Sequence, residues 1–171
     1  IANGLSEARL LEQIEILRSL QSRYPITVLC GSEVDIRADG TLDYSDELLE
    51  QLDVVVASVH SAMGQDGETM TNRIIKAMKH PAVTIIGHAS TRLLGSREPV
   101  DFDLDALLHA AKETGTAETG GGAAVLPAEA GISRPVTGTP RVEGAAMPRA
   151  AHSPAIIMSY APRVVSCTTR G

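Results

Sequence analysis

The stretch that decides the fold is Leu52-Asp53-Val54-Val55-Val56-Ala57-Ser58-Val59-His60. Its unbroken run of β-branched and small apolar residues predicts a strand that is buried on both faces. A polar stretch follows, and then an amphipathic helix is expected over about Glu68 to Lys79, where apolar side chains recur at helical spacing. A buried strand followed by such a helix is the repeating unit of parallel α/β folds.

The same unit recurs on both sides of this stretch. Upstream, residues 6–23 predict a helix, Ile26 to Cys30 a buried strand, and Ser45 to Leu52 a short helix. Downstream, Val83 to Gly87 predict a strand and Leu104 to Thr114 a helix. The fold class is therefore α/β, either a βα barrel or an open parallel sheet.

The next strand should begin at Thr116-Ala117, after the helix stop at Gly115, but the glycine run at residues 120–122 predicts that it breaks off. Composition changes at the same place. Residues 1–118 carry a net charge of −9, whereas residues 119–171 carry +3, contain neither Asp nor Lys, and hold six of the nine prolines. We expect one domain over 1–118 and a largely irregular, low-complexity tail over 119–171, which is disordered or the product of a shifted reading frame.

Composition also excludes several function classes. Three Tyr, one Phe and no Trp leave few aromatic platforms for stacking bases, and an acidic first part offers no broad surface for phosphates. There is no Walker loop, GxGxxG, HExxH or paired CxxC motif. No segment reads as a membrane span or signal peptide, so the expectation is a cytoplasmic protein that does not contact membranes.

Three side chains that can bind metals fall at corresponding places along the chain. Glu33 comes just past the first predicted strand, His60 directly after the second, and His88 directly after the third. The carboxyl ends of parallel strands meet at one edge, so these residues should converge. A carboxylate and two imidazoles suit Zn²⁺, Mn²⁺ or Fe²⁺. The alternative is that each is an ordinary hydrogen-bonded residue at a strand end, and the residues alone leave both interpretations open.

Other polar residues near these positions have secondary roles. Asp35 can orient a metal ligand as a hydrogen-bond acceptor. Arg92 and Arg97 lie in the loop after His88 and are candidates for binding phosphate, although an exposed surface pair explains them equally well. Of the remaining histidines, His80 is expected to cap a helix, His109 to be solvated, and His152 to have no role.

Several motifs together resemble the PHP (polymerase and histidinol phosphatase) domain of bacterial family X DNA polymerases. The resemblance extends in order through residues 1–118, and the Asp39–Tyr44 segment favours the polymerase branch over the free-standing histidinol phosphatases. The motifs are Ala2-Asn3-Gly4-Leu5-Ser6, Gly31-Ser32-Glu33-Val34-Asp35-Ile36, Asp39-Gly40-Thr41-Leu42-Asp43-Tyr44, residues 52–60, and Gly87-His88 followed by Arg92-Leu93-Leu94-Gly95.

The resemblance implies a distorted, TIM-like seven-stranded βα barrel, of which this chain holds a part. It implies a trinuclear centre of divalent metal ions, Mn²⁺ or Zn²⁺, that hydrolyses phosphoesters, in this branch as a 3′–5′ exonuclease in DNA repair. Glu33, His60 and His88 are then metal ligands, DNA 3′ ends are the substrate, and a polymerase domain lies in cis.

The chain also departs from the family pattern. The family's opening His-x-His pair and the Asp and His after it would lie before Ile1, and its closing Asp-x-His pair has no counterpart, because no Asp follows residue 105. At most three of nine expected ligands are present. Two alternatives therefore stand beside the exonuclease: a noncatalytic scaffold or interaction remnant, and a small-molecule phosphatase of the histidinol-phosphatase kind.

Overall fold

The computed structural model describes residues 4–24, 26–120, 123–125 and 157–160. They form an α/β structure around one sheet with strand order β5-β4-β3-β2-β1-β6. The strands are β1 (Val28–Asp35), β2 (Val54–Ser58), β3 (Ile85–Gly87), β4 (Ala117–Gly120), β5 (Ala123–Val125) and β6 (Ile157–Tyr160). β1 to β4 are parallel neighbours in chain order, β6 joins β1 in parallel, and β5 joins β4 antiparallel.

The helices alternate with the central strands, as the sequence predicts. They are α1 (Glu7–Leu20), the 3₁₀ turn η1 (Gln21–Arg23), α2 (Asp46–Leu49), α3 (Gly67–Met78) and α4 (Leu104–Thr114). Side chains of Ser6, Asp66 and Asp103 accept a backbone N–H at the starts of α1, α3 and α4. α4 ends at Gly115, whose φ of 72° is left-handed.

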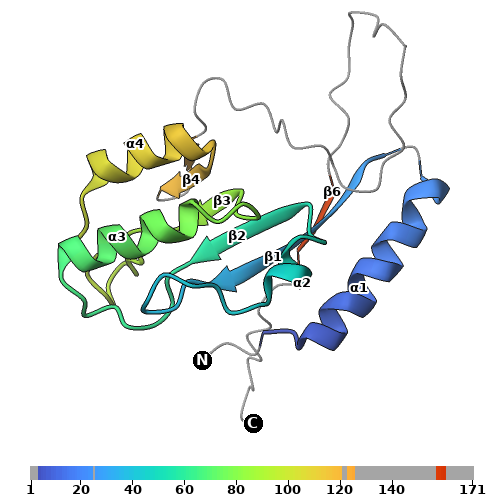
Figure 1. The fold of residues 1–171 in the computed structure, drawn as a ribbon, viewed down its shortest axis with the longest axis horizontal. Coiled ribbons are helices and arrows are strands. Elements are labelled where there is room, and N and C mark those ends of the chain that lie inside the picture. The colour runs from blue at the N-terminus through green and yellow to red at the C-terminus, as the bar shows by residue number, and fades with distance from the viewer. Residues whose placement is uncertain (1–3, 25, 121–122, 126–156, 161–171) are drawn as a thin grey trace, which may run out of the picture.

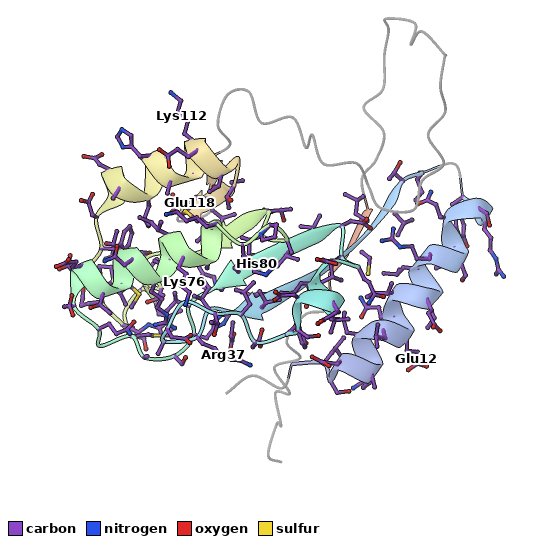
Figure 2. The ribbon with its side chains drawn as sticks, viewed as in Figure 1. Glu12, Arg37, Lys76, His80, Lys112 and Glu118 are labelled. Atoms are coloured by element: carbon purple, nitrogen blue, oxygen red, sulfur yellow. The ribbon has the colours of Figure 1, made fainter. Side chains whose placement is uncertain are left out.

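Figure 1 shows α3 and α4 beside each other at the β3–β4 part of the sheet, with α1 beside β1. The polar faces of the outer helices point away from the sheet, as the exposed Glu12 and Lys112 show in Figure 2.

The two faces of the sheet have different roles. Alternate residues of β1 and β2, such as Val34 and Val55, join one hydrophobic core with the buried residues of all four α-helices. Because side chains alternate along a strand, the residues between them point to the opposite face. Glu33 and Asp35 in β1 and Ser58 in β2 occupy that second face. The helices thus cover one face of the sheet, and the polar candidates lie on the other.

Two strands differ from the sequence expectation. β1 continues to Asp35, so Glu33 lies inside the strand and not past its end, because the chain keeps pairing in parallel until Asp35 meets Ser58. β4 does form, although the glycine run predicted that it would break off. Ala117, Glu118 and Thr119 pair with β3 in parallel, which satisfies their backbone groups although glycines follow.

Most of the predicted tail lies outside the described residues, including 126–156 and 161–171, and with them the expectation of disorder there. Of the tail beyond Gly120, the structure describes β5 and β6 at the two edges of the sheet. Among the described residues, none of the helices has both the length and the apolar character needed to span a bilayer.

Candidate metal centre

Glu33, His60 and His88 meet on the polar face of the sheet. The Glu33 Oε1 atom lies 3.4 Å from Nε2 of His60 and 3.3 Å from Nε2 of His88. One ligand atom from each of the three residues falls within 4.8 Å of the others. The two imidazole rings lie edge to face, with centroids 5.2 Å apart. The structure thus brings together the three residues that the sequence selected.

Three neighbouring parallel strands supply these residues. Glu33 is in β1, and His60 and His88 follow β2 and β3 by two residues and one residue. Parallel register aligns the strands so that Asp35 pairs with Ser58, and Ser58 with Gly87. The Glu33 side chain is only 13% exposed, whereas that of His88 is 51% exposed. A ligand would therefore reach the cluster from the His88 side.

The backbone at His88 bends sharply, with a φ of 35° in the left-handed region. Two hydrogen bonds hold this bend. The His88 N–H donates to the Thr119 hydroxyl (3.0 Å), and the Thr91 N–H donates to the His88 carbonyl (2.8 Å). Such a conformation is strained for a residue other than glycine and persists only where its surroundings fix it. The first residue of the predicted tail, Thr119, thus supports a candidate ligand.

Asp35 takes the orienting position that the sequence suggested. Its Oδ1 lies 2.5 Å from Nδ1 of His60, so the opposite ring atom, Nε2, is the one directed at Glu33. Metal-binding imidazoles usually donate their second N–H to such a carboxylate, which fixes the tautomer and the ring orientation.

Asp43 supports Asp35 from the next loop. Its Oδ1 accepts a hydrogen bond from the Asp35 N–H at 2.9 Å. Burial raises the pKa of the Asp43 carboxyl, and a backbone hydrogen bond and the nearby Arg37 and His60 act in the opposite direction. A half-buried carboxylate next to His60 adds negative potential that favours a cation at the cluster.

The three donors fit a divalent metal ion. Two imidazole nitrogens and a carboxylate oxygen are a ligand set that Zn²⁺ and Mn²⁺ accept. With Zn²⁺ bonds of about 2.0–2.1 Å, ligand atoms in a tetrahedral site lie about 3.3–3.4 Å apart. The spacings from Glu33 to the two histidines match this value.

Two residues of this face were missed by sequence reasoning. Ser58 is fully buried and donates its hydroxyl to Glu33 Oε1 at 2.7 Å. Strand alternation could have found it, since it shares a face with His60, two residues away. Asp43 lies in an acidic segment with Asp39, Asp46 and Glu47, and no sequence signal distinguishes it from these exposed neighbours.

The arginines proposed for phosphate binding lie in an exposed loop. Arg97 donates from Nε and from a terminal nitrogen to the Thr91 carbonyl, at 2.8 and 2.6 Å, so part of its hydrogen-bonding capacity stabilises the loop itself. Arg92 is exposed on the same loop. Their role in phosphate binding remains a prediction.

His80 and His109 lie away from the cluster. His80 follows α3 (Figure 2). Its Nδ1 accepts the Ala82 N–H and its Nε2 lies 3.3 Å from Oδ1 of Asp46, so both ring nitrogens make contacts within the fold. His109 is exposed, with its Nδ1 2.8 Å from the Asp105 carbonyl oxygen. His152 lies outside the described residues.

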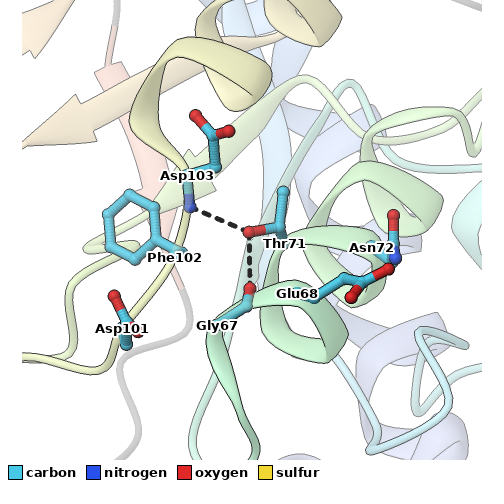
Figure 3. Close-up of a pocket in the computed structure, with 7 residues that line it drawn as sticks. All are labelled: Gly67, Glu68, Thr71, Asn72, Asp101, Phe102 and Asp103. Atoms are coloured by element: carbon cyan, nitrogen blue, oxygen red, sulfur yellow. Dashed lines mark hydrogen bonds between the residues drawn. The ribbon is translucent and has the colours of Figure 1, made fainter.

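A separate pocket of about 460 Å³ lies where α3 and α4 begin (Figure 3). Thr71 links the two helix starts, donating to the Gly67 carbonyl and accepting the Asp103 N–H. Glu68, Asp101 and Asp103 make its lining acidic. The pocket contains none of the three candidate ligands, and its hydrogen bonds join the helices to each other.

Comparison with known proteins identifies relatives of this chain. The chain is 38% identical over 118 residues to the DNA polymerase/3′-5′ exonuclease PolX of Bacillus subtilis, an alignment that covers 68% of the chain. The chain contains part of a PHP domain. This PHP segment is also 34% identical over 93 residues to a probable phosphatase of Clostridium acetobutylicum, and 38% identical over 94 residues to one of Thermoanaerobacter. No family model matches the chain.

The PHP segment is a small part of each relative. It spans 21% of the Bacillus subtilis protein and 36% of each of the two phosphatases. Together these relatives indicate a PHP-type phosphoesterase. The cluster of Glu33, His60 and His88, which is suited to divalent metals, is consistent with this.

Proposed function

We propose that this chain carries part of a metal-dependent phosphoesterase domain, with Glu33, His60 and His88 as metal ligands. One observation supports this most directly: a single carboxylate oxygen lies 3.3–3.4 Å from two imidazole nitrogens that come from different strands. Residues 1–118 make up the PHP segment in this proposal. Residues 119–171 form the tail that departs from the family.

The bound ion would supply Lewis-acid activation of a phosphoester and neutralise charge that develops on its oxygens. The residues of this chain perform the supporting tasks. Glu33 and the two histidines hold the ion, and Asp35 keeps His60 oriented through Nδ1. The exposed side of His88 leaves room for a substrate to approach. Arg92, and Arg97 through the N–H groups that it does not use for Thr91, would bind phosphate oxygens at the adjoining loop.

The finer proposal is a 3′–5′ exonuclease that acts on DNA ends during repair. This finer proposal has four further parts: DNA 3′ ends as the substrate, Mn²⁺ or Zn²⁺ as the ion, a polymerase domain in cis and a cytoplasmic location. The similarity to a DNA polymerase/3′-5′ exonuclease supports the DNA substrate and the polymerase domain, and the Glu33, His60 and His88 donors support a divalent ion. Parallel neighbours β1 to β4 in chain order, with helices on one face, are also what one segment of the proposed seven-stranded barrel would contain.

A second candidate is a phosphatase of small phosphomonoesters. It is favoured by the matches to probable phosphatases, which cover 53% of this chain. The few aromatic residues also leave little surface for stacking DNA bases. A noncatalytic scaffold that binds a single ion is the third interpretation, because three described ligands cannot build a trinuclear centre.

The test compares the 171-residue chain with a chimera in which residues 1–118 replace the matching segment of the Bacillus subtilis protein. Both are given 5′-labelled DNA or p-nitrophenyl phosphate in the presence of Mn²⁺. We expect the chimera to shorten DNA from the 3′ end, and Glu33→Gln to abolish this, whereas His109→Gln leaves it unchanged. Phosphate release without DNA shortening would support the phosphatase. A Glu33→Gln chimera with full activity would overturn the proposed metal role.

A further inference from the structure

Ser58 makes a specific contact at the centre of the candidate metal site. It is the last residue of β2, its side chain is completely buried, and its hydroxyl donates to Oε1 of Glu33 at 2.7 Å. That same oxygen faces Nε2 of both histidines. The hydroxyl therefore acts on the atom where the three candidate ligands converge.

Space for this hydroxyl comes from Gly87. In the parallel register Gly87 is the partner of Ser58, and a Cβ atom on Gly87 would lie 2.4 Å from the Ser58 Oγ and 3.0 Å from a methyl carbon of Val56. The first distance is far inside van der Waals contact. Gly87 is not among the positive-φ glycines of the described residues, so the backbone does not require a glycine there. The requirement is one of space, which the Ser58 hydroxyl fills most tightly and the Val56 methyl less so.

The contact has a clear physical consequence for a flexible carboxylate. A glutamate side chain has several rotamers, and binding a metal ion costs the entropy of selecting one of them. A hydrogen bond from a buried donor selects that rotamer in advance, and a carboxylate oxygen can accept it and still bind a cation. Groups that orient metal ligands in this way typically affect metal affinity 10–100-fold.

We propose that Ser58 is a positioning residue that fixes Glu33 for metal binding, and that Gly87 is required because it makes room for the Ser58 hydroxyl. This inference rests on the proposed metal site. In this proposal β2, through Ser58, and β3, through Gly87, position the Glu33 ligand of β1. It also explains why the residue before His88 has no side chain.

The test measures Zn²⁺ binding by calorimetry for the 171-residue chain and for three variants: Ser58→Ala, Gly87→Ala and the double variant. We expect Ser58→Ala to weaken binding about 10-fold or more. Gly87→Ala should weaken it comparably, because the added methyl displaces the hydroxyl. The double variant should bind about as strongly as Ser58→Ala, since the new methyl would meet the Ser58 Cβ at an ordinary 3.7 Å and only the Val56 methyl, at 3.0 Å, would have to shift by a few tenths of an ångström.

Ser32→Ala is the matched control. Ser32 is buried next to Glu33 but donates to the backbone carbonyl of Glu33 and not to its carboxylate. The Zn²⁺ affinity of Ser32→Ala should therefore stay within about twofold of that of the parent chain, a smaller change than replacing a residue that orients a ligand would cause. Circular dichroism checks that each variant is folded. The visible spectrum of bound Co²⁺ gives a second readout, and it should change in Ser58→Ala but not in Ser32→Ala.

The outcomes separate this inference from the function on which it rests. Equal affinities of the parent chain and Ser58→Ala would overturn the role of Ser58 and leave the metal site standing. A parent chain that binds Zn²⁺ no better than Glu33→Gln would overturn both. If Ser58→Ala does not fold, Gly87→Ala makes the same comparison, because it keeps the hydroxyl and moves it.

Discussion

Oδ1 of Asp35 lies 2.5 Å from Nδ1 of His60, and this pair sets which imidazole nitrogen faces Glu33. Both residues lie on the polar face of neighbouring strands, so the contact depends on the parallel register that pairs Asp35 with Ser58. A carboxylate at Nδ1 favours the tautomer with its proton there, which leaves Nε2 free to bind a cation.

Replacing Asp35 should therefore weaken metal binding without removing a ligand. For Asp35→Asn we expect a loss of about 10–100-fold in Zn²⁺ affinity, measured by calorimetry, because the amide holds the imidazole less strongly. Asp39→Asn is the control, since Asp39 caps an exposed turn at Thr41. Equal losses in both variants would show that the effect is one of general charge.

Metal binding should stabilise the fold. At a free Zn²⁺ concentration 100 times the dissociation constant, the free energy of unfolding should rise by about 2.7 kcal/mol, because the ion binds the assembled cluster and not the unfolded chain. Urea unfolding with and without Zn²⁺ measures this rise, and a chelator should reverse it. The same rise in Glu33→Gln would mean that the ion binds elsewhere.

Titration of the buried Cys30 thiol should lower the stability of the fold at alkaline pH. Burial, followed by the nearby Asp53 carboxylate, raises the pKa of the Cys30 thiol from 9.0 to about 11, while Arg18 acts in the opposite direction. Because the folded-state pKa is raised, this contribution is fully present below about pH 9 and is lost as the pH rises toward about 11. Urea unfolding from pH 8 to 11 should show a steeper decline for the parent chain than for Cys30→Ala. Parallel declines would contradict this assignment.

The buried Arg73 should be important for stability. Its guanidinium joins the loops that follow β1 and β2, and burial lowers its pKa. Its acceptors are the carbonyls of Ile36, Ser61 and Ala62 and the side chain of Gln65.

We expect Arg73→Met to lower the free energy of unfolding by about 3 kcal/mol, because the buried Ile36 carbonyl and the part-buried acceptors beside it lose a charged donor. Urea unfolding measures this change. Arg37→Ala is the control: Arg37 is exposed and donates one long hydrogen bond to the Asp43 carbonyl, so its effect should stay within about 0.5 kcal/mol. Similar losses in both variants would argue against a special role for Arg73.

The composition of residues 119–171 leads to a prediction about the gene. We propose that the reading frame shifts near residues 117–120, because Asp and Lys disappear beyond that point. Sequencing the DNA around codon 118 should reveal a shifted frame that encodes a PHP-like continuation. Shifted frames without any such continuation would rule the proposal out.

Much of the fold followed from residue patterns. The apolar run at residues 54–58 and the helical spacing of residues 67–78 are local signals, and both elements form close to where they were expected. α4 has the predicted bounds, because Asp103 and Gly115 mark its two ends chemically. β4 was predicted less well, since its stability comes from pairing with β3, which local glycine content does not reveal.

The sequence by itself determined which residue types can bind a metal and that each of the three belongs to a successive strand or directly follows it, because residue type and strand order are local properties. Only the tertiary structure decided how they meet. Parallel register carries Asp35 to His60, places the Ser58 hydroxyl on Glu33, and uses the missing side chain of Gly87 as space for it. These contacts join residues that are 25 or more positions apart, and a one-residue shift in pairing would turn each side chain to the opposite face.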